Sequence, residues 1–103
     1  MSSQSFDCIP AIKALGEESR MRIVRLLLAR PHCVMEISES LGLTVYNVSK
    51  HLRILREAGL VELEKHGQKR VYSLVPALSA ELSEPAQILD LGCCQFDFSK
   101  LPE

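Results

Sequence analysis

The chain has 103 residues, of which 47% are hydrophobic, 24% charged and only 5% aromatic. This length allows one domain with a modest core, which must be built from Leu, Ile and Val because aromatic residues are scarce. No apolar run approaches the roughly 20 residues that cross a bilayer. The opening residues, MSSQSFDCIP, lack the basic and apolar regions of a secretory signal. The composition therefore predicts a cytoplasmic protein with no membrane partner.

The net charge of −1 argues mildly against a nucleic-acid partner until it is resolved along the chain. Residues 44–75 carry six Lys or Arg against three Glu, a local charge of +3, whereas residues 76–103 carry one Lys against five Asp or Glu, a local charge of −4. Charges separated by more than about 8 Å are largely screened at physiological salt. A basic face for DNA is therefore compatible with the near-neutral total.

The first half of the chain predicts three helices, over residues 8–15, 17–29 and 34–41. The middle helix is dense in aliphatic side chains, which predicts that most of it is buried, and Pro31 ends it because the residue before a proline disfavours the helical conformation. Ile37 and Leu41 lie four residues apart on one face of the third helix. Gly42 is a typical residue to follow a helix end.

A fourth helix is predicted to begin after Thr44, a favourable N-cap. Its buried stripe repeats at steps of three and four residues and comprises Val45, Val48, Leu52 and Leu55. The opposite, solvated face carries polar and basic side chains: Tyr46, Asn47, Ser49, Lys50, Arg53 and Arg56.

From Leu60 the hydrophobic period changes to two, which predicts strands over residues 60–65 and 70–74 with Gly67 in the connecting turn. Residues 77–91 are compatible with a helix, although Pro85 either interrupts it or begins a second one. The fold class predicted is mainly α with a small β-hairpin. Helix, turn, helix and hairpin in this order are typical of a winged helix-turn-helix, which places one helix in the major groove of DNA and a basic loop beside the phosphates.

Two segments resemble the arsenic-repressor-type (ArsR/SmtB) winged-helix regulators. LGEESRMRIVRLL is similar to the family's opening pattern, and MEISESLGLTVYNVSKHLRILREAGLVELEKHGQKRVYSL is similar to its DNA-binding block. The resemblance covers residues 14–75 and is most specific at Ser49-Lys50-His51-Leu52 and Ala58-Gly59-Leu60-Val61. It implies a homodimer that represses a double-stranded DNA operator. It also implies one winged-helix domain over residues 1–103, with dimerisation segments at about 6–15 and 77–91 and a cysteine-containing tail at 92–103.

DNA-binding residues are expected on the fourth helix and in the hairpin. Asn pairs well with adenine edges, Lys with guanine, and Ser or Thr with a base or a phosphate. The expected set is Thr44, Tyr46, Asn47, Ser49, Lys50 and Arg53 on the helix and Lys65, His66, Lys69 and Arg70 in the wing. His51 precedes the buried Leu52 and is interpreted as a residue of helix packing or backbone contact.

Four cysteines suggest a thiol-dependent effector, because a disulfide framework is not expected in a reducing compartment. Thiolates suit As(III) or a soft divalent metal as inducer. Cys93 and Cys94 supply two sulfurs, and the third is Cys33 or, alternatively, Cys8, in one chain or across the dimer. Cys33 matches the first cysteine of the ELCVCDL motif of some relatives, whereas Met35 replaces the second. The zinc-type site of other relatives is not expected because residues 77–92 contain no His.

Several other interpretations remain open. Cys8 and Cys33 could be small buried apolar residues, and the tail could be disordered. The cysteines could instead oxidise reversibly in a redox or reactive-sulfur sensor, or the winged helix could contact only a protein. An enzyme using Cys33 or Cys94 as nucleophile and His32 or His66 as base is disfavoured, because no phosphate loop or oriented triad is recognisable. No organic cofactor is expected.

Overall fold

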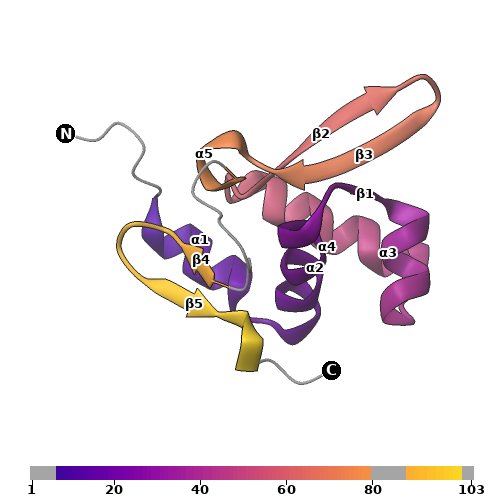
Figure 1. Cartoon of the computed structure of the whole chain (residues 1–103). Helices are drawn as coiled ribbons and strands as arrows, with labels where there is room; N and C mark the ends of the chain where they lie inside the picture. Colours follow the sequence, from indigo (N-terminus) through magenta and orange to yellow (C-terminus); the bar gives the residue numbers. More distant parts are fainter. Residues whose placement is uncertain (1–6, 80–87, 101–103) are drawn as a thin grey trace.

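The computed structural model of the chain describes residues 7–79 and 88–100. In chain order its elements are α1 (Cys8–Leu15), α2 (Glu18–Ala29), β1 (His32–Cys33), α3 (Val34–Leu41), α4 (Val45–Glu57), β2 (Val61–His66), β3 (Lys69–Leu74), α5 (Pro76–Ser79), β4 (Ile88–Asp90), β5 (Gln95–Asp97) and the 3-10 turn η1 (Phe98–Lys100). The helices form a compact body, from which the β2–β3 hairpin projects at one end (Figure 1). α1 and the β4–β5 hairpin lie at the other end. None of the helices in these residues is long and apolar enough to cross a membrane.

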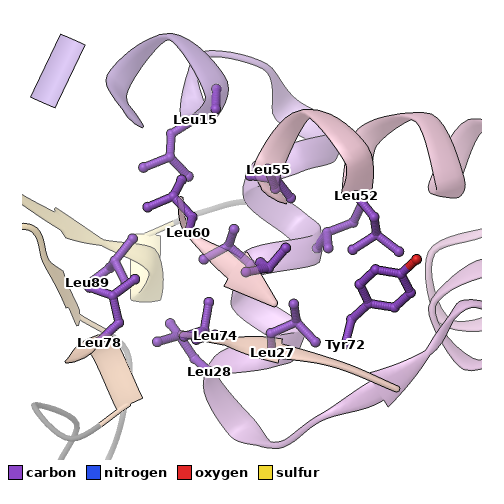
Figure 2. Close-up of a cluster of buried hydrophobic side chains, with 14 of the residues drawn as sticks. Leu15, Leu27, Leu28, Leu52, Leu55, Leu60, Tyr72, Leu74, Leu78 and Leu89 are labelled. Carbon is purple, nitrogen blue, oxygen red and sulfur yellow. The ribbon is translucent and has the colours of Figure 1, made fainter. Parts of the chain in front are cut away.

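One hydrophobic core joins the helices to both sheets. The aliphatic run of α2 lies at its centre, because α2 contacts α1, α3, α4 and β3. Figure 2 shows side chains from α2, α4 and the wing strands converging with Leu15 of α1, and Leu78 and Leu89 bring α5 and β4 to the same cluster. The core is built mainly of Leu, Ile and Val, as the composition predicts.

The helix-turn-helix comprises α3 and α4, and its ends agree with the sequence signals. Gly42 follows α3 in the left-handed conformation (φ 69°), which glycine adopts without the steric cost of a Cβ. The Ser38 hydroxyl donates to the Leu43 carbonyl at 2.6 Å, which ties the turn back onto α3. The Thr44 Oγ1 then accepts from the Asn47 N–H at 3.1 Å and caps α4.

The buried stripe of α4 is confirmed at three of its four predicted positions. Val48, Leu52 and Leu55 are fully buried, whereas Val45 is 43% exposed. The prediction for Val45 was wrong because this residue occupies the first turn of α4, where the helix has not yet reached the core.

The wing is confirmed; β2 is shifted by one residue from the predicted strand, and β3 begins one residue earlier than predicted and ends at the predicted residue. β2 and β3 pair in antiparallel register from Val61↔Leu74 to His66↔Lys69, and the short strand β1 adds to β3 on its other edge. Only two residues connect β2 and β3, the first being Gly67 with a φ of 68°. A glycine at this position is typical of tight two-residue hairpins.

The C-terminal segment differs from the predicted helix over residues 77–91. The helix that follows Val75 is the short α5, residues 80–87 lie outside the described residues, and β4 pairs with β5 from Ile88↔Asp97 to Asp90↔Gln95. Leu89, Leu91 and Phe98 are buried and alternate with exposed residues. The described part of the tail is therefore ordered because it contributes to the core, which contradicts the disordered alternative.

Candidate nucleic-acid interface and sulfur site

The exposed face of α4 carries the residues predicted to read DNA. Thr44, Asn47 and Ser49 are exposed near the start of the helix, and Tyr46 is 72% exposed. The Lys50 ammonium lies 5.9 Å from the centroid of the Tyr46 ring, a cation–π distance that holds both side chains on one side of the helix. This face therefore offers hydrogen-bonding groups and a positive charge in the first two turns of α4.

Arg53 lies farther along the same helix and is not free of intramolecular contacts. Its Nε donates to the Glu57 carboxylate at 3.2 Å, and both side chains are exposed. Exposed pairs of this kind contribute little to stability, on the order of 0.3–0.5 kcal/mol. The pair therefore presents only a small barrier to a contact between Arg53 and a phosphate.

The register of the wing brings its four predicted DNA-binding residues together. Lys65 lies opposite Arg70, and His66 lies opposite Lys69, next to the turn. All four are exposed. The His66 Nε2 lies 3.1 Å from the Glu64 carboxylate, which offsets part of the positive charge of the wing.

His51 packs against α2, as its position before Leu52 suggested. Its Nδ1 lies 3.2 Å from the Arg20 Nη1, and its Nε2 lies 4.0 Å from the Glu17 carboxylate. Burial of the ring lowers the pKa of His51; Glu17 acts in the opposite direction, and the charges of Arg20 and Lys50 lower it further. The ring is therefore neutral at physiological pH.

The sulfurs are arranged differently from the prediction. Cys8, in the first turn of α1, forms a disulfide with Cys93 in the β4–β5 turn, and the free Cys94 Sγ lies 4.0 Å from the Cys93 Sγ. The expectation that a disulfide was unlikely was wrong, because it considered compartment and local pairing but not the distant partner. Cys8, Cys93 and Cys94 therefore come together where α1 meets the β4–β5 turn, at the end of the molecule opposite the wing tip (Figure 1).

Cys33 is not part of this group. It is the half-buried N-cap of α3, and its strand position pairs with Val71 of the wing. The Cys33 N–H donates to the Glu36 carboxylate at 3.0 Å, and this hydrogen bond lowers the pKa of Glu36. With Cys8 bonded to Cys93, no group of three or more His, Cys, Asp or Glu across residues 7–79 and 88–100 is placed to hold a metal ion. The set Cys93, Cys94 and Cys33 is therefore not assembled within one chain.

Asp90 and Gly92, which hold the sulfur-bearing turn, were missed at the sequence level. One oxygen of Asp90 accepts from the Gly92 N–H at 2.8 Å and the other accepts from the Gln95 side-chain amide at 3.1 Å. The missed signal was the alternation of Ile-Leu-Asp-Leu and Gln-Phe-Asp-Phe on either side of Gly92. Period-two patterns flanking a glycine indicate a hairpin.

Comparison with known proteins agrees with this geometry. The family model described as "Bacterial regulatory protein, arsR family" matches residues 17–62, which include α2, the helix-turn-helix and the start of the wing. The uncharacterized HTH-type transcriptional regulator Rv0081 of Mycobacterium tuberculosis is 38% identical over 71 residues, 68% of this chain; the match spans 62% of that regulator's length. The Arsenical resistance operon repressor of Escherichia coli is 34% identical over 82 residues, 76% of this chain and 70% of the repressor.

Solved structures share the fold. Reduced HlyU from Vibrio cholerae superimposes with a TM-score of 0.64 at 34% identity, over 70% of this chain and 77% of that one. The homodimeric winged helix-turn-helix DNA-binding domain Mb0332 of Mycobacterium bovis has a TM-score of 0.65 at 28% identity, over 69% of this chain and 66% of that one. In sequence, the transcriptional activator HlyU of V. cholerae is 33% identical over 95 residues, 92% of this chain and 85% of the activator. The chain therefore belongs to the arsR family of bacterial regulatory proteins and has its winged helix-turn-helix fold.

Proposed function

We propose that this protein is a transcriptional repressor that binds an operator through α4 and the wing. The supporting observation is that the first turns of α4, whose polar and basic side chains are exposed, and the wing tip lie at the same end of the molecule (Figure 1). A helix of this kind enters the major groove, and the wing approaches the neighbouring phosphates. Tyr46, Asn47 and Lys50 are the proposed base-reading residues, and the wing residues add attraction that depends little on sequence.

The repressor would act as a homodimer. α1 exposes Ile9 (63%) and Ile12 (42%), and β4 exposes Ile88 (49%), all at the end away from the wing tip. The relative Mb0332 is described as homodimeric. A two-fold axis at this end would direct two copies of α4 toward successive major grooves, which are about 34–36 Å apart. The β4–β5 hairpin would then take part in the interface in place of the long C-terminal helix predicted over residues 77–91.

We further propose that the sulfurs of Cys8, Cys93 and Cys94 control DNA binding, with As(III) as inducer. Reduction of the disulfide would leave three thiols close together, and trivalent arsenic prefers soft thiolate ligands. Each thiol would give its proton to one hydroxyl group of arsenous acid and form an arsenic–sulfur bond, so that the three hydroxyl groups leave as three water molecules while the arsenic stays bound. This proposal replaces Cys33 by the alternative third ligand, Cys8, because Cys8 is already bonded to Cys93. The same thiols would also suit a soft divalent metal.

A second candidate, control by oxidation, is favoured by the disulfide itself. A peroxide would accept two electrons from the thiols of Cys8 and Cys93, which would form the sulfur–sulfur bond while the two protons leave in water. This reaction requires only those two cysteines. The arsenic reaction requires Cys94 as well. Replacement of Cys94 is therefore expected to abolish the response to arsenite but not the response to peroxide.

The test is fluorescence anisotropy with DNA from upstream of the protein's own gene, using reduced protein alone, with arsenite, and with peroxide. Under the arsenic proposal, Cys94→Ser abolishes release by arsenite, and Cys8→Ser does the same. Cys33→Ser is the matched control and keeps the wild-type response. Release by peroxide alone, retained in Cys94→Ser and reversed by a reductant, would replace the arsenic proposal by the redox one. No binding by reduced protein at low salt would refute the repressor itself.

A further inference from the structure

Arg20 connects three helices through its side chain. It lies in the first turn of α2, and its Nε donates to the Ala14 carbonyl in the last turn of α1 at 2.5 Å. Its Nη1 lies 3.2 Å from the His51 Nδ1 on α4. A guanidinium only donates hydrogen bonds. The ring nitrogen of His51 must therefore accept, and the contacts run without a break from the end of α1 to the recognition helix.

This chain of contacts also determines where the His51 proton resides. Because Nδ1 accepts from Arg20, the neutral ring carries its proton on Nε2, the nitrogen nearer the Glu17 carboxylate. The His51 side chain is only 18% exposed, so water competes weakly for these contacts. The ring is thus held between Arg20, in the first turn of α2, and Glu17, the N-cap of the same helix.

At its other end, this series of contacts is connected through α1 to Cys8. α1 has only eight residues; it begins at Cys8, and Ala11, Ala14 and Leu15 anchor it in the core. A change at Cys8 therefore acts on a short rigid element that ends at the carbonyl bound by Arg20. α1 and α4 are in contact. An open surface groove of about 350 Å³ runs along their junction, between Pro10 and Lys13 of α1 and Ile54 and Glu57 of α4.

We propose that Arg20 is a positioning residue that transmits movement of α1 to the recognition helix α4. This inference rests on the second candidate of the proposed function, in which oxidation of Cys8 and Cys93 controls DNA binding by α4. The groove gives α1 room to shift relative to the C-terminal half of α4. The Arg20 fork converts that shift into a displacement of His51, which lies between the proposed base-reading residues and the buried stripe.

The experiment compares DNA affinity of the disulfide-bonded and reduced full-length protein. Coupling of this kind commonly changes affinity by about 5–150-fold. For the wild type, the ratio of the DNA affinities of the reduced and disulfide-bonded forms is expected in this range. Arg20→Lys keeps the charge but lacks the planar fork needed for both acceptors, so the ratio falls below about 2. Arg30→Gln removes a charge at the end of the same helix and is the control; it keeps the wild-type ratio.

Variants of His51 separate positioning from general structural damage. His51→Leu removes the acceptor and is expected to abolish the difference between the two states, whereas His51→Asn places an amide oxygen near the former Nδ1 and restores it. The double variant Arg20→Lys/His51→Leu is expected to lose no more than either single variant. A wild-type ratio in Arg20→Lys, or equal losses in His51→Leu and His51→Asn, would overturn the proposal.

A second readout needs no DNA. Nitrogen NMR of the His51 ring is expected to change when the wild-type disulfide is reduced and to stay unchanged in Arg20→Lys. If wild-type affinity does not respond to the sulfurs while this ring signal does, the proposed function fails and the connection through Arg20 stands. An unresponsive wild-type ring signal refutes the connection, whatever the DNA affinities show.

Discussion

Replacement of Lys69 by Gln tests whether the wing contacts DNA phosphates. Lys69 is exposed beside the two-residue turn and faces His66 across the hairpin. Each neutralised phosphate contributes about 0.9 to the slope of log affinity against log salt, and a homodimer carries two wings, so the slope is expected to become shallower by about 1.8. Between about 50 and 200 mM salt, the variant would lose about 12-fold less affinity than the wild type.

The assay is a salt titration of operator binding by fluorescence anisotropy, with native mass spectrometry to confirm equal subunit number. Lys13→Gln is the control, because it removes the same charge from α1, away from the wing tip (Figure 1). Its slope is expected to match the wild type. An unchanged slope in Lys69→Gln, or an equal change in Lys13→Gln, would show that the wing does not lie against the phosphates.

Three further predictions concern the scaffold of α4. Leu55→Ala removes a fully buried side chain and is expected to lower the free energy of unfolding by about 2–5 kcal/mol; a loss below about 1 kcal/mol in urea denaturation would contradict the described core. Thr44→Ala removes the helix cap and is expected to cost about 1 kcal/mol, whereas Thr44→Ser should keep most of the stability. The lowered pKa of His51 means that the unfolded chain binds its proton first as the pH falls, so stability is complete above the ordinary pKa of 6.5 and decreases from there through the lower folded pKa. Thermal melts should show this decrease in the wild type and a smaller one in His51→Asn; equal slopes would refute the assignment.

The helix-turn-helix and wing could be predicted from sequence because their signals are local. The cap at Thr44, the stripe from Val48 to Leu55 and the turn at Gly67 each depend on a few neighbouring residues, and all three are confirmed. Three of the four ends of β2 and β3 differ by one residue from the prediction. The pairing register decides where a strand ends, and the sequence of one strand alone does not indicate this register. The strand β1 was missed for the same reason, since two residues form no readable pattern.

The C-terminal hairpin and the disulfide could not be predicted by the same reasoning. The composition around Ile88 is compatible with a helix, and only the burial of Leu89 and Leu91 against the core selects a strand. The pairing of Cys8 with Cys93 joins residues 85 apart in sequence, a distance over which no local pattern operates. The position of His51 was anticipated, but its contact with Arg20 depends on how α2 packs against α4.

The link between Cys8 and Cys93 has a consequence for how the protein is degraded. Exposed loop tips are preferred cleavage sites for proteases, and the wing tip offers Lys69 and Arg70 in an exposed hairpin. Any single cut between the two linked cysteines divides the backbone into two fragments that stay covalently attached. A nicked molecule would therefore run as one species on a denaturing gel until a reductant separates the two fragments. The wing could thus be cleaved while the two fragments remain in one molecule.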